Sequence, residues 1–190
     1  MARLIVYNFL TLNGFYKAPG GDIRWASKQE QSQEEDDFAL ENLKKGSILL
    51  FGRATYDMMI TYWPTEQATK NNPGMAKKMN EAEKIVFSST LKKAEWNNTR
   101  IIGKDMIKEI GKMKGSSLKD MTILGSGSIV TQFAEAGLID EYQFMLYPVA
   151  LGEGTSEFDG MDRKLELRLD STRSFKNGCI LLTYKPVSKE

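Results

Sequence analysis

The sequence predicts an α/β fold on a mostly parallel sheet with antiparallel strands at its C-terminal edge. Up to about residue 137, short apolar segments alternate with segments of helical periodicity, which is the pattern of parallel strands joined by crossover helices. Beyond that point only strand-like segments follow. The last two flank Asn177-Gly178, a dipeptide typical of tight hairpins. With 190 residues, the chain is expected to form a single domain over 1–190.

Glycine, proline and apolar periodicity place the individual elements. The first strand is rich in strand formers, and a loop with several glycines follows it. The first helix ends before Gly46, and the helix over 105–113 has apolar residues at three-and-four spacing. The expected strands are 3–10, 47–51, 84–87, 100–102, 121–124, 139–148, 166–175 and 178–184, the expected helices are 29–45, 54–60, 75–83, 105–113 and 128–136, and the loop is 11–27.

The amino-acid counts exclude several kinds of chemistry. The chain has no histidine, so Ser–His–Asp catalysis, histidine-bound zinc and histidine general bases are unavailable. A single cysteine, Cys179, allows no internal disulfide, and without histidine it leaves no metal site to expect. The remaining chemistry must come from carboxylates, lysines, tyrosines or a bound cofactor.

Charge and hydropathy describe the expected surroundings of the protein. The net charge is +1 with acidic and basic residues interspersed, so we expect no nucleic-acid partner. No segment has the length of a membrane span, and the N-terminus lacks the pattern of a signal peptide. We therefore expect a cytoplasmic protein without a membrane partner, whose partner is a small-molecule substrate.

Two strand-to-helix turns carry the strongest functional signal. Strand 47–51 runs into Gly52-Arg53-Ala54-Thr55, and strand 121–124 runs into Gly125-Ser126-Gly127-Ser128. Such turns allow backbone N–H groups and a helix N-terminus to approach a phosphate, although glycine also ends strands for steric reasons alone. The second turn is not a dinucleotide fingerprint of the Rossmann type, because Val130 occupies the third glycine position.

Two further features extend the phosphate interpretation. Arg53 has planar donors that suit a phosphate, and Ser88-Ser89 ends another strand with hydroxyl groups. Each has a plain alternative, a solvated arginine at a helix end and a polar turn. Taken together, the three loops predict a nucleotide cofactor with a pyrophosphate and one further phosphate.

In their order and spacing, segments 50–56, 86–89, 124–128 and 138–142 resemble the signature of the dihydrofolate-reductase-like superfamily. They are most similar to the reductase domain of the bifunctional deaminase–reductase of riboflavin biosynthesis, as is 148–154. The resemblance covers roughly residues 3–184 and implies a three-layer fold with helices on both faces of the sheet. It also implies an NADPH-dependent reductase that transfers hydride to a small heterocyclic or carbonyl substrate, similar to dihydrofolate reductase or 5-amino-6-(5-phosphoribosylamino)uracil reductase.

The resemblance also implies residue roles. The first turn would meet the pyrophosphate and the adenosine side, the serine pair the 2′-phosphate, and the second turn the pyrophosphate. A 2′-phosphate near Arg53 favours NADPH over NADH. The implied cofactor residues are Gly52, Arg53, Ala54, Thr55, Ser88, Ser89, Gly125, Ser126, Gly127 and Ser128.

The substrate side is less defined. Asp36 lies sixteen residues before Gly52, a spacing similar to that of the acid in dihydrofolate reductases, so it is the candidate catalytic residue. An acidic run near a helix start is also favourable for dipole reasons alone. The candidate substrate residues are Asn8, Asn13 and Trp25, and Asn13 stands where the family usually has aspartate. Core packing is the alternative role for Trp25.

Three hypotheses on function and one on assembly follow. One is a structural protein without a ligand, in which the three loops are a coincidence. The other two are an NADPH-dependent reductase, which we expect, and a catalytically silent nucleotide-binding module of the same fold, which Asn13 and the lack of a secure acid favour. Oxidation of NADPH with candidate substrates separates the two. A homodimer is expected because the apolar run 179–182 is placed at a sheet edge and because similar proteins are often dimeric.

Overall fold

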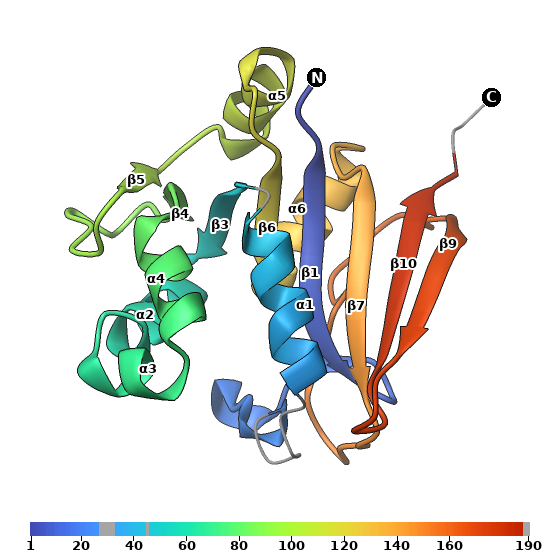
Figure 1. Cartoon of the computed structure of the whole chain (residues 1–190). Helices are drawn as coiled ribbons and strands as arrows, with labels where there is room; N and C mark the ends of the chain where they lie inside the picture. Colours follow the sequence, from blue (N-terminus) through green and yellow to red (C-terminus); the bar gives the residue numbers. More distant parts are fainter. Residues whose placement is uncertain (27–32, 45, 188–190) are drawn as a thin grey trace.

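The computed structural model describes residues 1–26, 33–44 and 46–187 (Figure 1). Its central sheet has eight strands in the order β5-β4-β3-β6-β1-β7-β10-β9. All pairs from β5 to β7 are parallel, whereas β10 is antiparallel to both β7 and β9, which confirms the predicted sheet. The strands are β1 Leu4–Thr11, β3 Ile48–Gly52, β4 Lys84–Phe87, β5 Thr99–Ile102, β6 Met121–Leu124, β7 Glu141–Tyr147, β9 Leu167–Ser174 and β10 Ile180–Pro186.

Helices cover both faces of this sheet, because successive strand residues point to opposite sides. Leu50 belongs to a buried cluster with residues of α5 and α6, whereas Leu49 and Phe51 belong to another cluster with α2 and α4. Helix α1 contributes Phe38 to a third cluster beside β7 and β10. The helices are α1 Gln33–Lys44, α2 Arg53–Tyr62, α3 Glu66–Asn71, α4 Pro73–Glu81, α5 Met106–Ser116 and α6 Gly127–Glu135. The three-layer expectation is confirmed.

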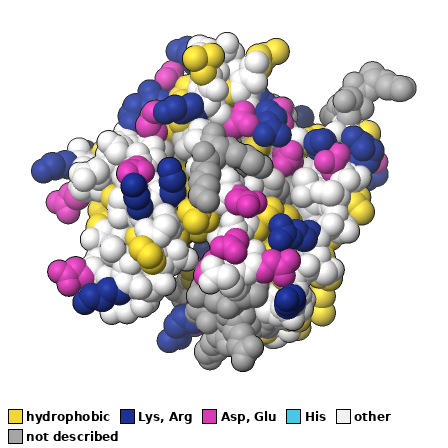
Figure 2. Space-filling model, viewed as in Figure 1, with side chains coloured by type: hydrophobic (Ala, Val, Ile, Leu, Met, Phe, Trp, Pro, Cys, Tyr) yellow, Lys and Arg dark blue, Asp and Glu magenta, His cyan; other side chains and the backbone are white. Residues whose placement is uncertain are grey.

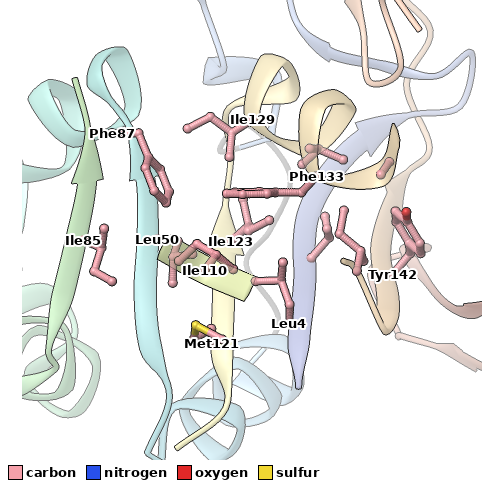
Figure 3. Packing of buried hydrophobic residues seen from close by; sticks show 14 of the residues in the cluster. Leu4, Leu50, Ile85, Phe87, Ile110, Met121, Ile123, Ile129, Phe133 and Tyr142 are labelled. Carbon is pink, nitrogen blue, oxygen red and sulfur yellow. The ribbon is translucent and has the colours of Figure 1, made fainter. Parts of the chain in front are cut away.

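The largest cluster fixes α6 above the carboxyl half of the sheet. Ile129 and Phe133 are almost completely buried, and Figure 3 shows both side chains over Leu50 and Ile123 of the central strands. Close packing of this kind holds the start of α6 at a defined position beside β3 and β6. The segment Gly125–Ser128 is thereby placed at the sheet edge where the parallel strands end.

Two parts of the expected secondary structure were incomplete. The loop expected over 11–27 contains a short strand, β2 (Phe15–Lys17), which pairs with β8 (Thr155–Ser156). Helix α3 was not expected, and Thr65 caps it by accepting the Ala68 N–H. These elements have two to six residues, too few for a periodic pattern. The predicted helix start at 29–32 lies outside the described residues.

The outermost antiparallel strand of the sheet is not the one that the dimer prediction assumed. The run 179–182 lies at the start of β10, which has β7 on one side and β9 on the other. Its cysteine and Leu181 are buried, and the outer strand is β9. The apolar run therefore gives no argument for a dimer interface, and the homodimer stays a prediction.

Among the helices of the described residues, none combines the length and the apolar character of a membrane span.

Candidate functional site

A pocket of about 650 Å³ lies at the sheet edge where the parallel strands end. Residues that follow β3, β4 and β5 line it, together with the first turn of α6. Because carboxyl ends of parallel strands meet at one edge, segments distant in sequence come together here. Six of the ten predicted cofactor residues lie on its wall, namely Gly52, Arg53, Ala54, Ser88, Ser89 and Ser128.

Three helices begin at this pocket without a capping side chain. The cap residues of α2, α5 and α6 are Gly52, Asp105 and Ser126, and within the described chain none of them makes a side-chain capping hydrogen bond. Residues of all three first turns line the pocket. Uncapped N–H groups and the positive ends of helix dipoles both favour an anion. This arrangement suits a ligand that carries more than one phosphate.

Two cationic side chains, Arg53 and Lys104, line the same pocket. The Arg53 Nε lies 2.6 and 2.8 Å from the two carboxylate oxygens of Asp57. The two side chains are 42% and 49% exposed, so this pair contributes at most about 1 kcal/mol and leaves Arg53 able to turn toward a ligand. Ser88 Oγ accepts the N–H of Leu91 at 3.0 Å, which shapes the serine loop while Ser89 stays exposed.

The two glycine turns are joined to each other by Ser126. Its hydroxyl accepts the N–H of Gly52 at 2.8 Å and lies 2.8 Å from Thr55 Oγ1. A side chain on Gly52 would place its Cβ 2.5 Å from the same hydroxyl, so glycine is required there. Thr55 and Ser126 therefore hold the turns in register, and neither lines the pocket.

A buried polar pair lies behind the second turn. Asn8 Oδ1 accepts the N–H of Gly125 at 2.7 Å, and Asn8 Nδ2 donates to Glu157 Oε1 at 2.6 Å. Asn8 is thus buried within the protein, where it supports the turn. Burial raises the pKa of Glu157 to about 8, although the hydrogen bond from Asn8 acts in the opposite direction. Gly127 packs against the Tyr16 ring, which a Cβ would approach to 2.7 Å.

The α1 face of the sheet carries an aromatic cluster beside two carboxylates. Edge contacts join Tyr147 to Trp25 and to Phe9, with ring centroids 5.7 and 5.4 Å apart. Among the described residues, the buried indole nitrogen of Trp25 and the buried Tyr7 hydroxyl have no hydrogen-bond partner. Unpaired buried donors of this kind are costly and are often found where a ligand binds. Trp25 therefore packs in the core and also presents a polar group.

The carboxylates come from the first turn of α1. Glu35 is buried and accepts hydrogen bonds from the Tyr147 hydroxyl and from Asn177 Nδ2. Asp36 is half-buried, and burial raises its pKa, with Glu35 and Asp37 raising it further. Acidic side chains gather over α1 in Figure 2, so the dipole argument for this run also holds.

Asn13 fastens two loops together. Its Nδ2 donates to the Leu151 carbonyl at 2.7 Å, and its Oδ1 accepts the Thr11 hydroxyl at 2.9 Å and the Leu151 N–H at 3.3 Å. This side chain is therefore used in positioning the loop after β1. In the described structure, Asn13 does not line the pocket.

Several site residues were missed from the sequence. Gly103 and Lys104 follow β5 on the pocket wall, and the strand–glycine signal used for Gly52 also marks them. Glu35 adjoins Asp36 but was not separated from the acidic run. Glu157 lies in a loop without any periodic pattern, so nothing in its local sequence marks it. Among the described residues, no group of three or more acidic or cysteine side chains could hold a metal ion.

The chain matches the family model of the RibD C-terminal domain over residues 2–181, and it belongs to this family. Its fold is that of the dihydrofolate-reductase-like superfamily, and the family is related to the reductase of riboflavin biosynthesis. Among curated relatives, the uncharacterised protein YyaP of Bacillus subtilis strain 168 is 28% identical over 182 residues, 96% of this chain and 94% of that protein. A second uncharacterised protein of that strain, YwjB, is 21% identical, and the match covers 91% of this chain and 92% of YwjB.

Solved structures share the fold. A protein of Shewanella sp. PV-4 assigned to riboflavin biosynthesis has a TM-score of 0.78 at 18% identity, covering 99% of this chain and all of that one. The Thermotoga maritima diaminohydroxyphosphoribosylaminopyrimidine deaminase/5-amino-6-(5-phosphoribosylamino)uracil reductase has a TM-score of 0.67 at 13% identity. That match covers 98% of this chain and 57% of the Thermotoga protein. The resemblance found in the sequence is thereby confirmed at the level of family and fold.

Proposed function

We propose that the protein is a reductase that binds NADPH in the pocket at the carboxyl edge of the sheet. The observation that carries this proposal is the meeting of three uncapped helix N-termini with Arg53 and Lys104 around one pocket. A pyrophosphate and a further phosphate would satisfy these N–H groups and cations together. Membership of a family related to a reductase supports the same ligand.

The preference for NADPH over NADH is assigned to four residues of the pocket wall. Arg53, Ser88, Ser89 and Lys104 offer charge and hydroxyl groups there for a 2′-phosphate. Charge-assisted contacts to one phosphate are worth about 1–3 kcal/mol, which corresponds to about ten- to a hundredfold in affinity.

Bound NADPH supplies the hydride, and the chain supplies position, a dry surface and a proton. The aromatic cluster around Tyr7, Trp25 and Tyr147 suits a flat heterocyclic substrate, and a carbonyl compound is the other class proposed. Asp36 is the proposed proton donor, because burial raises its pKa and so keeps a proton available closer to neutral pH. Glu35 is already engaged by Tyr147 and Asn177, which fixes that end of the cluster.

The test has two separate measurements. Fluorescence titration should give a lower Kd for NADPH than for NADH, and equal values would reject the 2′-phosphate assignment. A spectrophotometric screen of oxidised heterocycles and small carbonyl compounds should then find one that consumes NADPH. Absence of NADPH binding in a correctly folded protein would reject the cofactor proposal itself.

A second function is favoured by one observation and stays open to the same screen. Asn13, which stands where similar chains have an aspartate, forms hydrogen bonds with Leu151 and Thr11. This arrangement fits a nucleotide-binding module without turnover. Tight NADPH binding with no oxidation by any substrate class in the screen would support this module over the reductase.

A further inference from the structure

Glu157 is a buried acid that forms no ion pair among the described residues. It is 2% exposed, and its Oε1 accepts from Asn8 Nδ2 at 2.6 Å. Its other oxygen, Oε2, is buried and has no hydrogen-bond partner in the described part of the chain. The Tyr142 hydroxyl is also buried without a partner and interacts electrostatically with Glu157. Burying a carboxyl in such surroundings is costly, and an apolar residue would avoid the cost. The contribution of the carboxyl must therefore come from its hydrogen bond with Asn8.

Glu157 fixes the orientation of the Asn8 side-chain amide. Asn8 can place either its oxygen or its nitrogen toward the turn, but only Oδ1 can accept the Gly125 N–H. Because Glu157 Oε1 accepts from Nδ2, the amide is fixed with Oδ1 facing Gly125 at 2.7 Å. The hydrogen bonds thus run from the turn through Asn8 to Glu157 in one direction.

The turn needs this support because its backbone is unusual. Gly125 and Ser126 have φ values of +68° and +65°, so two consecutive residues are left-handed. For Ser126, which has a Cβ, this conformation is unfavourable, and Ser126 is the N-cap residue of α6. An acceptor for the Gly125 N–H stabilises it. Loss of that acceptor would leave the partly buried N–H without its partner.

We propose that Glu157 is a positioning residue for the cofactor-binding turn: through Asn8 it holds Gly125 and Ser126 in the conformation that presents the start of α6 to the cofactor's phosphates. The proposal rests on the proposed NADPH function. It assigns no contact with the cofactor to Glu157 itself.

A dependence on alkaline pH follows from the surroundings of this acid. Tyr142 of β7 interacts electrostatically with the Glu157 carboxyl, and the Tyr16 ring of β2 and the Glu157 backbone carbonyl both lie against Gly127. Neither tyrosine is a cation. A neutral carboxyl can still accept from Asn8 through Oε1 when its proton is on Oε2. As pH rises past the Glu157 pKa of about 8, an uncompensated charge develops behind the turn and favours local opening. NADPH affinity should then fall between pH 7 and 9.

The experiment compares the wild type with Glu157→Gln, Glu157→Met and a matched control, Glu153→Gln, which removes an exposed carboxylate from the segment just before β8. Glutamine keeps the Oε1 acceptor and cannot ionise, so E157Q should bind NADPH within about threefold of the wild type at pH 7. It should also lose the decline toward pH 9. Methionine removes the acceptor with little change in volume, and E157M should bind NADPH at least tenfold more weakly. E153Q should match the wild type at every pH.

A measurement without cofactor separates this proposal from the NADPH proposal. Amide hydrogen exchange at Gly125 should be fast in E157M, and it should be slow in the wild type and in E157Q. If the wild type binds no NADPH, the proposed function fails, and the exchange experiment still decides the role of Glu157. Wild-type affinity and slow Gly125 exchange in folded E157M would overturn the proposal. If E157M does not fold, Asn8→Ala replaces it, and unchanged NADPH affinity in that variant would overturn the proposal equally.

Discussion

Replacing Glu157 by glutamine should change how stability depends on pH. The pKa of this acid is about 8 in the folded protein against an ordinary value of 4.5, so between these values the folded state keeps a proton that the unfolded chain releases. The free energy of unfolding therefore falls as pH rises through this window, by about 1.4 kcal/mol per unit. From pH 5 to 7.5 the loss attributable to Glu157 is roughly 3 kcal/mol. It is complete above about pH 8.

Urea denaturation of the wild type and of E157Q measures this contribution directly. Because glutamine does not titrate, the stability of E157Q relative to the wild type should increase by roughly 3 kcal/mol from pH 5 to 7.5. E153Q is the control, and its difference from the wild type should stay nearly constant, because that side chain is exposed. Parallel profiles for E157Q and the wild type would show that the carboxyl is solvated, and the burial argument would fail.

Four further predictions test the site and the assembly. Arg53→Met should weaken NADPH binding by about ten- to a hundredfold and NADH binding much less, whereas Asp57→Asn should strengthen NADPH binding by no more than severalfold, as two titrations would show. Gly127→Ala, whose Cβ meets a tyrosine ring at 2.7 Å, should cost about 1–3 kcal/mol on denaturation, but Gly111→Ala, with open space in α5, should stabilise by about 0.5–1 kcal/mol. Asp36→Asn should lower turnover by about 10²–10⁴ at unchanged NADPH affinity, and equal turnover would leave only its dipole role. Light scattering should give a dimer, and a mass near 21.5 kDa would contradict it.

The parts of the fold that follow local rules could be predicted from the sequence. Strands β3 and β6 are apolar runs that end at glycine, and Gly125 has the positive φ that such a turn requires. The carboxyl-edge rule then placed both turns at one site. Gly103 follows strand β5 in the same way, close to the start of α5, the third helix at the pocket. It was missed because β5 is short and partly exposed.

Contacts between distant segments could not be predicted in this way. Asn8 and Glu157 are 149 positions apart, and nothing in either local sequence indicates that one amide hydrogen joins them. Likewise, Ser126 lies in a glycine-rich turn and has a hydroxyl that suits a phosphate, yet this hydroxyl accepts the N–H of Gly52. Six of the residues predicted from residue type and spacing therefore line one pocket, but only the fold distinguishes side chains on the pocket wall from those that support the turn.

Strand β1 connects the two halves of the proposed site. Successive residues of a strand point to opposite faces, so Asn8 supports the Gly125 turn on one side while Tyr7 enters the aromatic cluster beside α1 on the other. The strand lies between β6 and β7, within the parallel part of the sheet. A cofactor held at the turn and a substrate held at the cluster would therefore meet beyond the carboxyl end of β1. Small shifts of this one strand should therefore alter the affinity for the proposed cofactor and the position of the proposed substrate together.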